Sequence, residues 1–128
     1  MSTYISSNAT IHNNVYIGDN VKIYGNTIIG KGTVIEDNVI IGKPSNQEII
    51  KLREDTTLTY NDLSIQNTNI SENCIIGAGT VIYSGVSLGT GVEIEDYCMV
   101  GANTFIGRKT RLMYRCLVYN RVRIGEKQ

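Results

Sequence analysis

The sequence predicts an all-β fold, a three-sided parallel β-helix interrupted by one inserted loop. The first observation is a six-residue repeat in which an aliphatic residue opens each unit and a small residue follows four places later. This period fits neither a helix nor a plain strand, but it fits a chain that turns a corner after every short extended segment. The second observation is that the rhythm stops between residues 47 and 69 and then resumes. We therefore predict a single domain over residues 1–128, with repeat blocks at 5–46 and 70–128.

The repeat predicts which side chains face the interior. In the first block the opening positions are Ile5, Ile11, Ile17, Ile23, Ile29, Ile35 and Ile41. In the second block they are Ile70, Ile76, Ile82, Leu88, Ile94, Val100, Ile106, Leu112, Val118 and Ile124. Because three units make one coil, residues eighteen apart should stack one strand spacing, roughly 4.8 Å, along the axis. Ile70 is therefore expected under Leu88.

Small companion residues should line the same interior, and they include Ser45 and all three cysteines, Cys74, Cys98 and Cys116. We interpret these cysteines as reduced core thiols rather than disulfide or metal partners. The corners between segments require residues that tolerate a left-handed backbone. In the first block the expected corner residues are Asn8, Asn14, Asn20, Asn26, Gly32 and Asn38.

The interruption at residues 47–69 carries charge and only scattered apolar residues. A break of this length in a regular solenoid predicts an external loop, and such loops are often functional. Two interpretations remain open: a projecting loop that helps to wall a site, or decoration. Ile49, Ile50 and Leu52 can either fold back onto the prism or reach a neighbouring subunit.

The bulk composition excludes several functions. The formal net charge is zero, which gives no electrostatic case for nucleic acid or membrane. No apolar run is long enough to span a bilayer and no signal pattern opens the chain, so we expect a cytoplasmic protein. Basic residues nevertheless gather between Arg108 and Lys127, either as a solvated end or as a rim that contacts phosphate.

Outward positions suggest an assembly. Val81, Met99 and Leu117 are spaced by eighteen and should form one apolar stripe on an outer face. Such a stripe predicts a cyclic oligomer, unless the inserted loop covers it within its own subunit. No capping helix follows Ile124, so we expect either a piece of a longer protein or a partner that covers the last coil.

The unit [Ile/Leu/Val]-Gly-x-x-[small]-x recurs as IGDNVK, IGKGTV, IGAGTV, LGTGVE, VGANTF and IGRKTR. On these motifs the chain resembles the hexapeptide-repeat acyltransferases, whose domain is a left-handed parallel β-helix. The left hand comes from this resemblance alone, since parallel crossovers generally favour the right hand. The segments VIIGKP (39–44) and NISENCIIGAGTVIYSGV (69–86) resemble the branch that acetylates nucleotide-linked amino sugars.

The resemblance implies acetyl-CoA as co-substrate, a small sugar-like acceptor, and a homotrimer that binds acetyl-CoA in grooves between prisms. It also implies a histidine that deprotonates the acceptor, but Asp96 stands where that histidine would be. Asp96 is therefore one candidate base, with Glu95 beside it to crowd its charge. Both can equally be solvated surface residues. The only histidine, His12, is a third candidate in a distant unit. One histidine cannot supply a three-histidine zinc site, so no metal is predicted.

Four residues are candidate contacts for acetyl-CoA. Arg115 and Arg121 occupy corner positions that Asn or Gly hold elsewhere, and a guanidinium suits the phosphates of CoA. Tyr83 and Tyr119 are two coils apart and should lie on one face, where they can contact a ligand or form plain surface. The sequence thus supports two functions: an acetyl-CoA-dependent acyltransferase acting on a sugar, or a non-catalytic β-helix that scaffolds partners.

Overall fold

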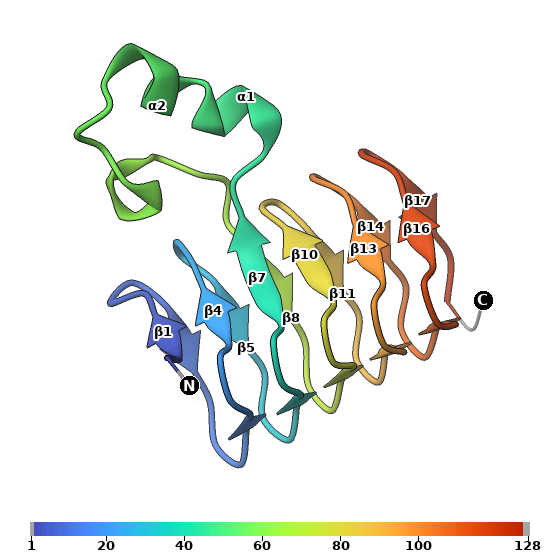
Figure 1. Ribbon diagram of the computed structural model, residues 1–128. Helices are drawn as coiled ribbons and strands as arrows, with labels where there is room; N and C mark the ends of the chain where they lie inside the picture. The colour runs from blue at the N-terminus through green and yellow to red at the C-terminus, as the bar shows by residue number, and fades with distance from the viewer. Residues whose placement is uncertain (1, 127–128) are drawn as a thin grey trace.

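The computed structural model describes residues 2–126, which form three parallel sheets along one axis (Figure 1). Sheet A contains β1 (Tyr4–Ile5), β4 (Lys22–Ile23), β7 (Ile40–Lys43), β10 (Val81–Tyr83), β13 (Met99–Val100) and β16 (Leu117–Val118). Sheet B contains β2 (Thr10–Ile11), β5 (Ile28–Ile29), β8 (Asn69–Ile70), β11 (Ser87–Leu88), β14 (Phe105–Ile106) and β17 (Arg123–Ile124). Sheet C contains β3 (Tyr16–Ile17), β6 (Val34–Ile35), β9 (Ile75–Ile76), β12 (Glu93–Ile94) and β15 (Arg111–Leu112).

Each coil contributes one strand to each sheet, and the predicted ladders are confirmed. Leu88 pairs with both Ile70 and Ile106, and Ile82 pairs with Val100. The chain climbs through sheet A on the near side of Figure 1, returns behind, and advances from the N-terminus at the left to the C-terminus at the right. This path is left-handed. The predicted left-handed parallel β-helix is therefore confirmed.

Three corners connect the sheets, and we name them by the sheets they join. The AB corner comprises residues 6–9, 24–27, 84–86, 101–104 and 119–122, together with the insertion. The BC corner comprises residues 12–15, 30–33, 71–74, 89–92 and 107–110. The CA corner comprises residues 18–21, 36–39, 77–80, 95–98 and 113–116.

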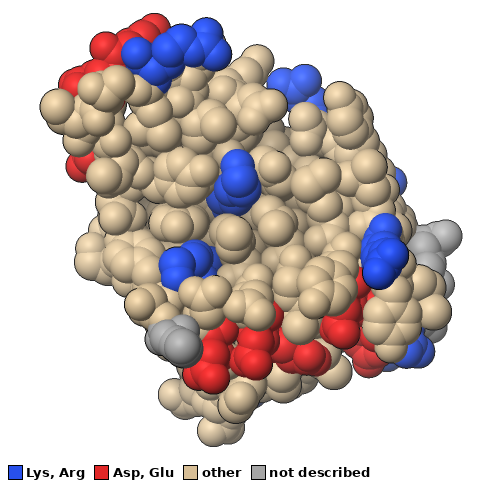
Figure 2. Space-filling view, in the orientation of Figure 1, with Lys and Arg blue, Asp and Glu red and all other residues tan. Residues whose placement is uncertain are grey.

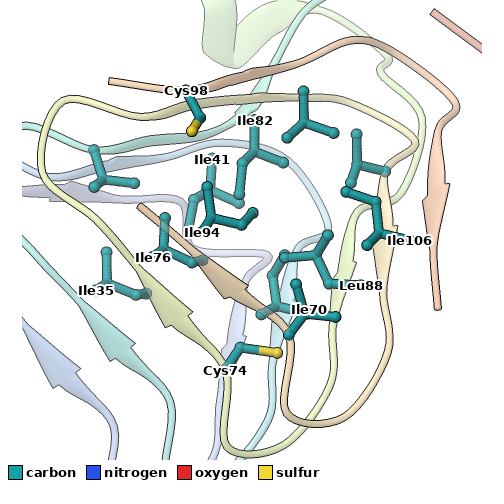
Figure 3. Close-up of a cluster of buried hydrophobic side chains, with 14 of the residues drawn as sticks. Ile35, Ile41, Ile70, Cys74, Ile76, Ile82, Leu88, Ile94, Cys98 and Ile106 are labelled. Carbon is teal, nitrogen blue, oxygen red and sulfur yellow. The ribbon is translucent and has the colours of Figure 1, made fainter. Parts of the chain in front are cut away.

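The interior is a column of aliphatic side chains. Ile35, Ile41, Ile70, Ile76, Ile82, Leu88, Ile94 and Ile106 point into it from all three sheets (Figure 3). Buried threonines at companion positions tie neighbouring coils together: the Thr80 hydroxyl donates to the carbonyl of Glu95 at 3.1 Å and accepts from the Cys98 amide at 3.3 Å. Burying a hydroxyl costs little when it has such partners. The cysteines are free thiols, and burial raises the pKa of Cys74 to about 11.

Left-handed corners lie mostly where the sequence predicts them. Asn14, Asn20, Gly32 and Asn38 have positive φ angles. Asn26 does not, because Gly25 adopts the left-handed conformation one residue earlier, at φ 69°.

Asn8 is also not left-handed. Its turn is closed by Ser6, whose hydroxyl accepts from the Asn8 amide at 3.1 Å and whose carbonyl accepts from the Ala9 amide at 3.0 Å. This turn therefore needs no left-handed residue.

The insertion separates β7 from β8 and contains α1 (Asn46–Ile49), α2 (Lys51–Glu54) and the 3₁₀-helix η1 (Tyr60–Asp62). Ser45 is not the inward companion expected from the repeat. It is the N-cap of α1, because its side chain accepts from the Glu48 amide while Glu48 accepts from the Ser45 amide. Thr68, which is buried, precedes β8 in the companion position instead.

Glu48 fastens the insertion to the prism. Its Oε1 accepts from the hydroxyl of buried Ser84 at 2.6 Å, and its Oε2 accepts from the Gln66 amide at 2.8 Å. Beyond this anchor α1 and α2 project from the prism (Figure 1), and neither contains a buried residue. Ile50 is 46% exposed, so it does not fold back onto the prism wall, whereas Ile49 and Leu52 are half-buried.

Candidate functional site

A hollow lies at the AB corner, below the start of α1. It has a volume of about 200 Å³, and Tyr83, Met99, Leu117 and Tyr119 line it together with Asn46 of α1. Tyr83 and Tyr119 thus lie on one face, as their spacing predicts. The register explains this, since β10, β13 and β16 are consecutive strands of sheet A.

A second hollow of about 150 Å³ adjoins the first, because Ser45, Asn46 and Asn120 line both. Arg121 and Gln47 complete it. We call the two together the AB groove. Three of the four residues predicted to contact acetyl-CoA, Tyr83, Tyr119 and Arg121, therefore line one groove, whereas Arg115 lies at the CA corner.

The arginine corners are left-handed, as the repeat predicts. Arg115 and Arg121 both have φ of 58° and are exposed. Among the described basic residues after Gly107, Arg108 pairs with Glu126, Arg111 pairs with Glu95, and Arg123 lies over the ring of Phe105. Lys109, Arg115 and Arg121 have no ion pair among residues 2–126, so their charges remain available. Lys127, at the end of the basic run, lies outside the described residues.

Glu95 is engaged in an ion pair. Its carboxylate accepts from Arg111 at 2.6 Å, and its side chain is 18% exposed. The negative charge of Glu95, and after it a hydrogen bond to Glu95, raise the pKa of Tyr114. A hydrogen bond between two charged groups is stronger than one between neutral groups. Both hydrogen bonds from Arg111 go to Oε2 of Glu95, so the ion pair balances the charge of this carboxylate.

Asp96 is held through one oxygen. Its Oδ1 accepts from the amide of Ala78, one coil below, at 3.0 Å, and its second oxygen has no hydrogen-bond partner among residues 2–126. The same contact recurs elsewhere: Asp37 accepts from the Asp19 amide at 2.8 Å, and Asn120 accepts from the Ala102 amide at 2.9 Å. Asp37, Asp96 and Asn120 thus each join two neighbouring coils from this position of the repeat.

His12 lies at the BC corner of the first coil, so it is on a different edge from both Asp96 and the AB groove. The three candidate bases are therefore not assembled into one constellation within the chain. Among residues 2–126 no group of three or more His, Cys, Asp or Glu side chains is arranged to hold a metal.

Sheet A presents a broad face with few charged side chains (Figure 2). Val81, Met99 and Leu117 stack along it as predicted, and Leu117 is 61% exposed. The insertion does not cover this stripe, because it packs elsewhere: Tyr60 meets Tyr24 edge-on, with ring centroids 5.2 Å apart. The CA corner below the face carries a row of acidic side chains (Figure 2), including Asp19, Glu36, Asp37, Glu95 and Asp96.

The sequence analysis missed two residues of the groove, Asn46 and Asn120. Asn46 reaches the groove because Ser45 starts a helix, and Asn120 reaches it from the AB corner that follows β16. The spacing from Ser45 to Glu48 is a capping-box signal that could have indicated this helix. Asn120 has no such signal, since asparagine is common at the corners.

The family model described as "Bacterial transferase hexapeptide (six repeats)" matches residues 3–43 and 67–102. The matched segments cover more than half of the chain and stop on either side of the insertion. The chain belongs to the bacterial transferase hexapeptide family. No curated protein matches the sequence of this hexapeptide-repeat chain.

Among solved structures, the hexapeptide-repeat chain is similar to the acetyltransferase domain of PglB from Neisseria gonorrhoeae FA1090. The identity is 17% and the TM-score 0.65, over 98% of this chain and 47% of that one. The same domain in complex with acetyl coenzyme A matches with 14% identity and a TM-score of 0.65, over 96% of this chain and 54% of that one. PerB from Caulobacter crescentus, in complex with CoA and GDP-perosamine, matches with 16% identity and a TM-score of 0.41. The match covers 92% of this chain and 52% of that one.

The hexapeptide-repeat chain therefore spans about half the length of these structures, and at such identities the likeness concerns the fold. None of the helices within residues 2–126 is long and apolar enough to cross a membrane.

Proposed function

We propose that this chain is the β-helix part of an acetyl-CoA-dependent acyltransferase that acetylates an amino or hydroxyl group of a sugar or nucleotide-linked sugar. The observation that supports this proposal is the AB groove, where two tyrosines and an unpaired arginine meet on a transferase hexapeptide fold. The solved PglB domain, which has a similar fold, was determined with acetyl coenzyme A bound.

The groove offers chemistry suited to this co-substrate. Arg121 can pair with phosphate oxygens, and a planar guanidinium makes two such bonds at once. The rings of Tyr83 and Tyr119 and the side chain of Leu117 provide apolar contact for a slender acyl-pantetheine chain. Acetyl transfer then needs a base for the acceptor and N–H donors for the developing oxyanion.

Asp96 is the proposed base. Its anchored Oδ1 fixes the carboxylate, and the free oxygen is available to accept a proton from the acceptor. Asp96 lies at the CA corner and the groove at the AB corner, so the two flank sheet A on opposite edges. A neighbouring subunit packed against sheet A would bring one subunit's Asp96 towards another's groove, which is why the proposal includes a trimer.

A direct test of the co-substrate is calorimetric titration with acetyl-CoA. We expect Arg121→Asn to weaken binding about tenfold, since a hydrogen bond to a charged group is lost. Asparagine fits the corner, because Asn103 holds the equivalent left-handed position one coil earlier with φ of 59°.

The matched control for Arg121→Asn is Lys109→Asn, which removes an unpaired cation from a left-handed position of the BC corner, where Asn73 also stands. Binding by this control should be unchanged. No heat from the unaltered chain, or equal weakening by both variants, would contradict the proposed use of the AB groove.

The assembly has its own test. Leu117→Glu places a charge on the exposed stripe of sheet A and is expected to convert a trimer into monomers in sedimentation velocity. Ile75→Glu places the same charge on sheet C, where Ile75 is 39% exposed, and should leave the trimer intact. A Leu117→Glu trimer would show that another face forms the contact.

A non-catalytic scaffold remains the second candidate. It is favoured by the recurrence of the Asp96 contact at Asp37 and Asn120, which gives Asp96 a sufficient structural reason to be present. A chain that binds no acetyl-CoA yet still forms trimers would support the scaffold.

A further inference from the structure

One hollow on the described surface has no part in the function proposed above. It lies at the BC corner and has a volume of about 430 Å³. Strands β5 and β8 line it, and it extends from His12 in the first coil to Thr90 in the fourth. Ligand pockets generally begin at about 300 Å³, so the hollow is large enough to accept a small molecule. Its polar side chains are His12, Lys31, Asn69, Ser71, Glu72 and Thr90.

These six side chains share one property within the described part of the chain. Among residues 2–126, none of their side-chain polar atoms forms a hydrogen bond or ion pair with another protein group. At the CA and AB corners the equivalent polar side chains are used within the fold, as in the contacts of Asp37, Asp96 and Asn120. Along the first four coils, the BC corner therefore keeps these side chains out of coil-to-coil contacts within residues 2–126, whereas farther along the axis Arg108 pairs with Glu126.

The charges are ordered along the axis. Lys31 and His12 belong to the first two coils, where they offer an ammonium group and an imidazole N–H. Glu72 follows in the third coil and Thr90 in the fourth. At one strand spacing per coil, the distance from His12 to Thr90 along the axis is about 14 Å. One end thus suits an anion and the other suits hydroxyl groups.

The second end is chemically specific. Carboxylate, amide and hydroxyl groups from Glu72, Asn69 and Ser71 can accept from and donate to several hydroxyls of one ligand. Gly30 has no side chain and lines the hollow between the two ends, and Ile28, which is 43% exposed, adds an apolar wall. We propose that the BC hollow binds a phosphorylated sugar, with the phosphate at Lys31 and His12 and the hydroxyl groups at Glu72 and its neighbours.

The test is titration of the ¹⁵N-labelled chain with glucose 6-phosphate, followed through the backbone amide signals. We expect saturable shifts at Gly30, Lys31, Ser71 and Thr90. Inorganic phosphate and glucose form separate arms, and each should bind at least about tenfold more weakly, because each can use only one end of the hollow.

Two variants with matched controls test the two ends. Lys31→Ala and Glu72→Gln should each weaken glucose 6-phosphate binding about tenfold. Lys51→Ala and Glu54→Gln make the same changes on the exposed helix α2 and should leave glucose 6-phosphate binding unchanged. The amide spectrum of each variant reports whether it is folded.

Three results would overturn the proposal: no shifts at the BC corner, inorganic phosphate binding as tightly as the sugar phosphate, or equal weakening by the α2 variants. Because the AB groove is on another edge of the prism, acetyl-CoA binding can fail while this site persists, and the reverse also holds.

Discussion

Asp96→Asn is expected to reduce acetyl transfer by about 10²–10⁴-fold, the usual contribution of a general base, while leaving the stability of the fold unchanged. Asparagine keeps an oxygen that accepts from the Ala78 amide, as Asn120 does from the Ala102 amide at 2.9 Å. The substitution therefore removes only the oxygen that is proposed to accept the proton, and it keeps the oxygen that accepts from Ala78. The measurements are the acetyl-transfer rate of the trimeric protein with a sugar amine and the midpoint of thermal unfolding.

Asp37→Asn is the matched control, because Asp37 makes the same contact with the Asp19 amide. It should change neither rate nor stability. If Asp96→Asn retains full activity, Asp96 serves only to join coils and the base must come from elsewhere. If Asp96→Asn and Asp37→Asn both lose stability, the negative charge of the carboxylate, and not its hydrogen bond, stabilises the CA corner.

Ile76→Ala is expected to lower the free energy of unfolding by about 2–5 kcal/mol, the range for large-to-small changes in a packed core. Ile76 is fully buried, and it stacks between Ile35 and Ile94 in sheet C. The cavity cannot be filled by a neighbouring coil, since each coil is already held in register above and below. Urea denaturation followed by circular dichroism measures the loss.

Ile75→Ala is the control for this experiment, since it is the same change on the same strand. Ile75 faces outward and is 39% exposed, so its loss should stay below about 1 kcal/mol. Equal losses at the two positions would contradict the division of each strand into an inward and an outward residue. An unfolding transition in two steps would show that the coils on either side of Ile76 unfold separately.

The sequence predicted where most candidate residues lie in the repeat, but it did not predict which of them line the same groove. The spacing of Tyr83 and Tyr119 indicated a shared face, and the corner positions of Arg115 and Arg121 indicated left-handed residues. The spacing did not indicate that Arg121 would line a groove with the tyrosines while Arg115 would not. Arg121 lies at the AB corner, where the helix that begins after Ser45 forms the other wall of the groove, whereas Arg115 lies at the CA corner.

The ion pair of Glu95 shows why electrostatic roles were harder to predict. Glu95 was expected to crowd the charge of Asp96, but Arg111 from the next coil binds its carboxylate. The two residues are sixteen apart, so they meet only because the coils stack. The ion pair thus depends on the direction of two side chains, which the repeat does not reveal.

The sequence alone determined the architecture of this protein: the six-residue period dictates which side chains face inward, because each short segment must bury its own aliphatic residue. It also located the interruption, since residues 47–69 lack that period. Only the tertiary structure decided that Glu48 anchors the insertion to Ser84, that Asp96 holds Ala78, and that the BC corner keeps a polar hollow. These contacts join residues from different coils, and their geometry arises only when the coils are stacked.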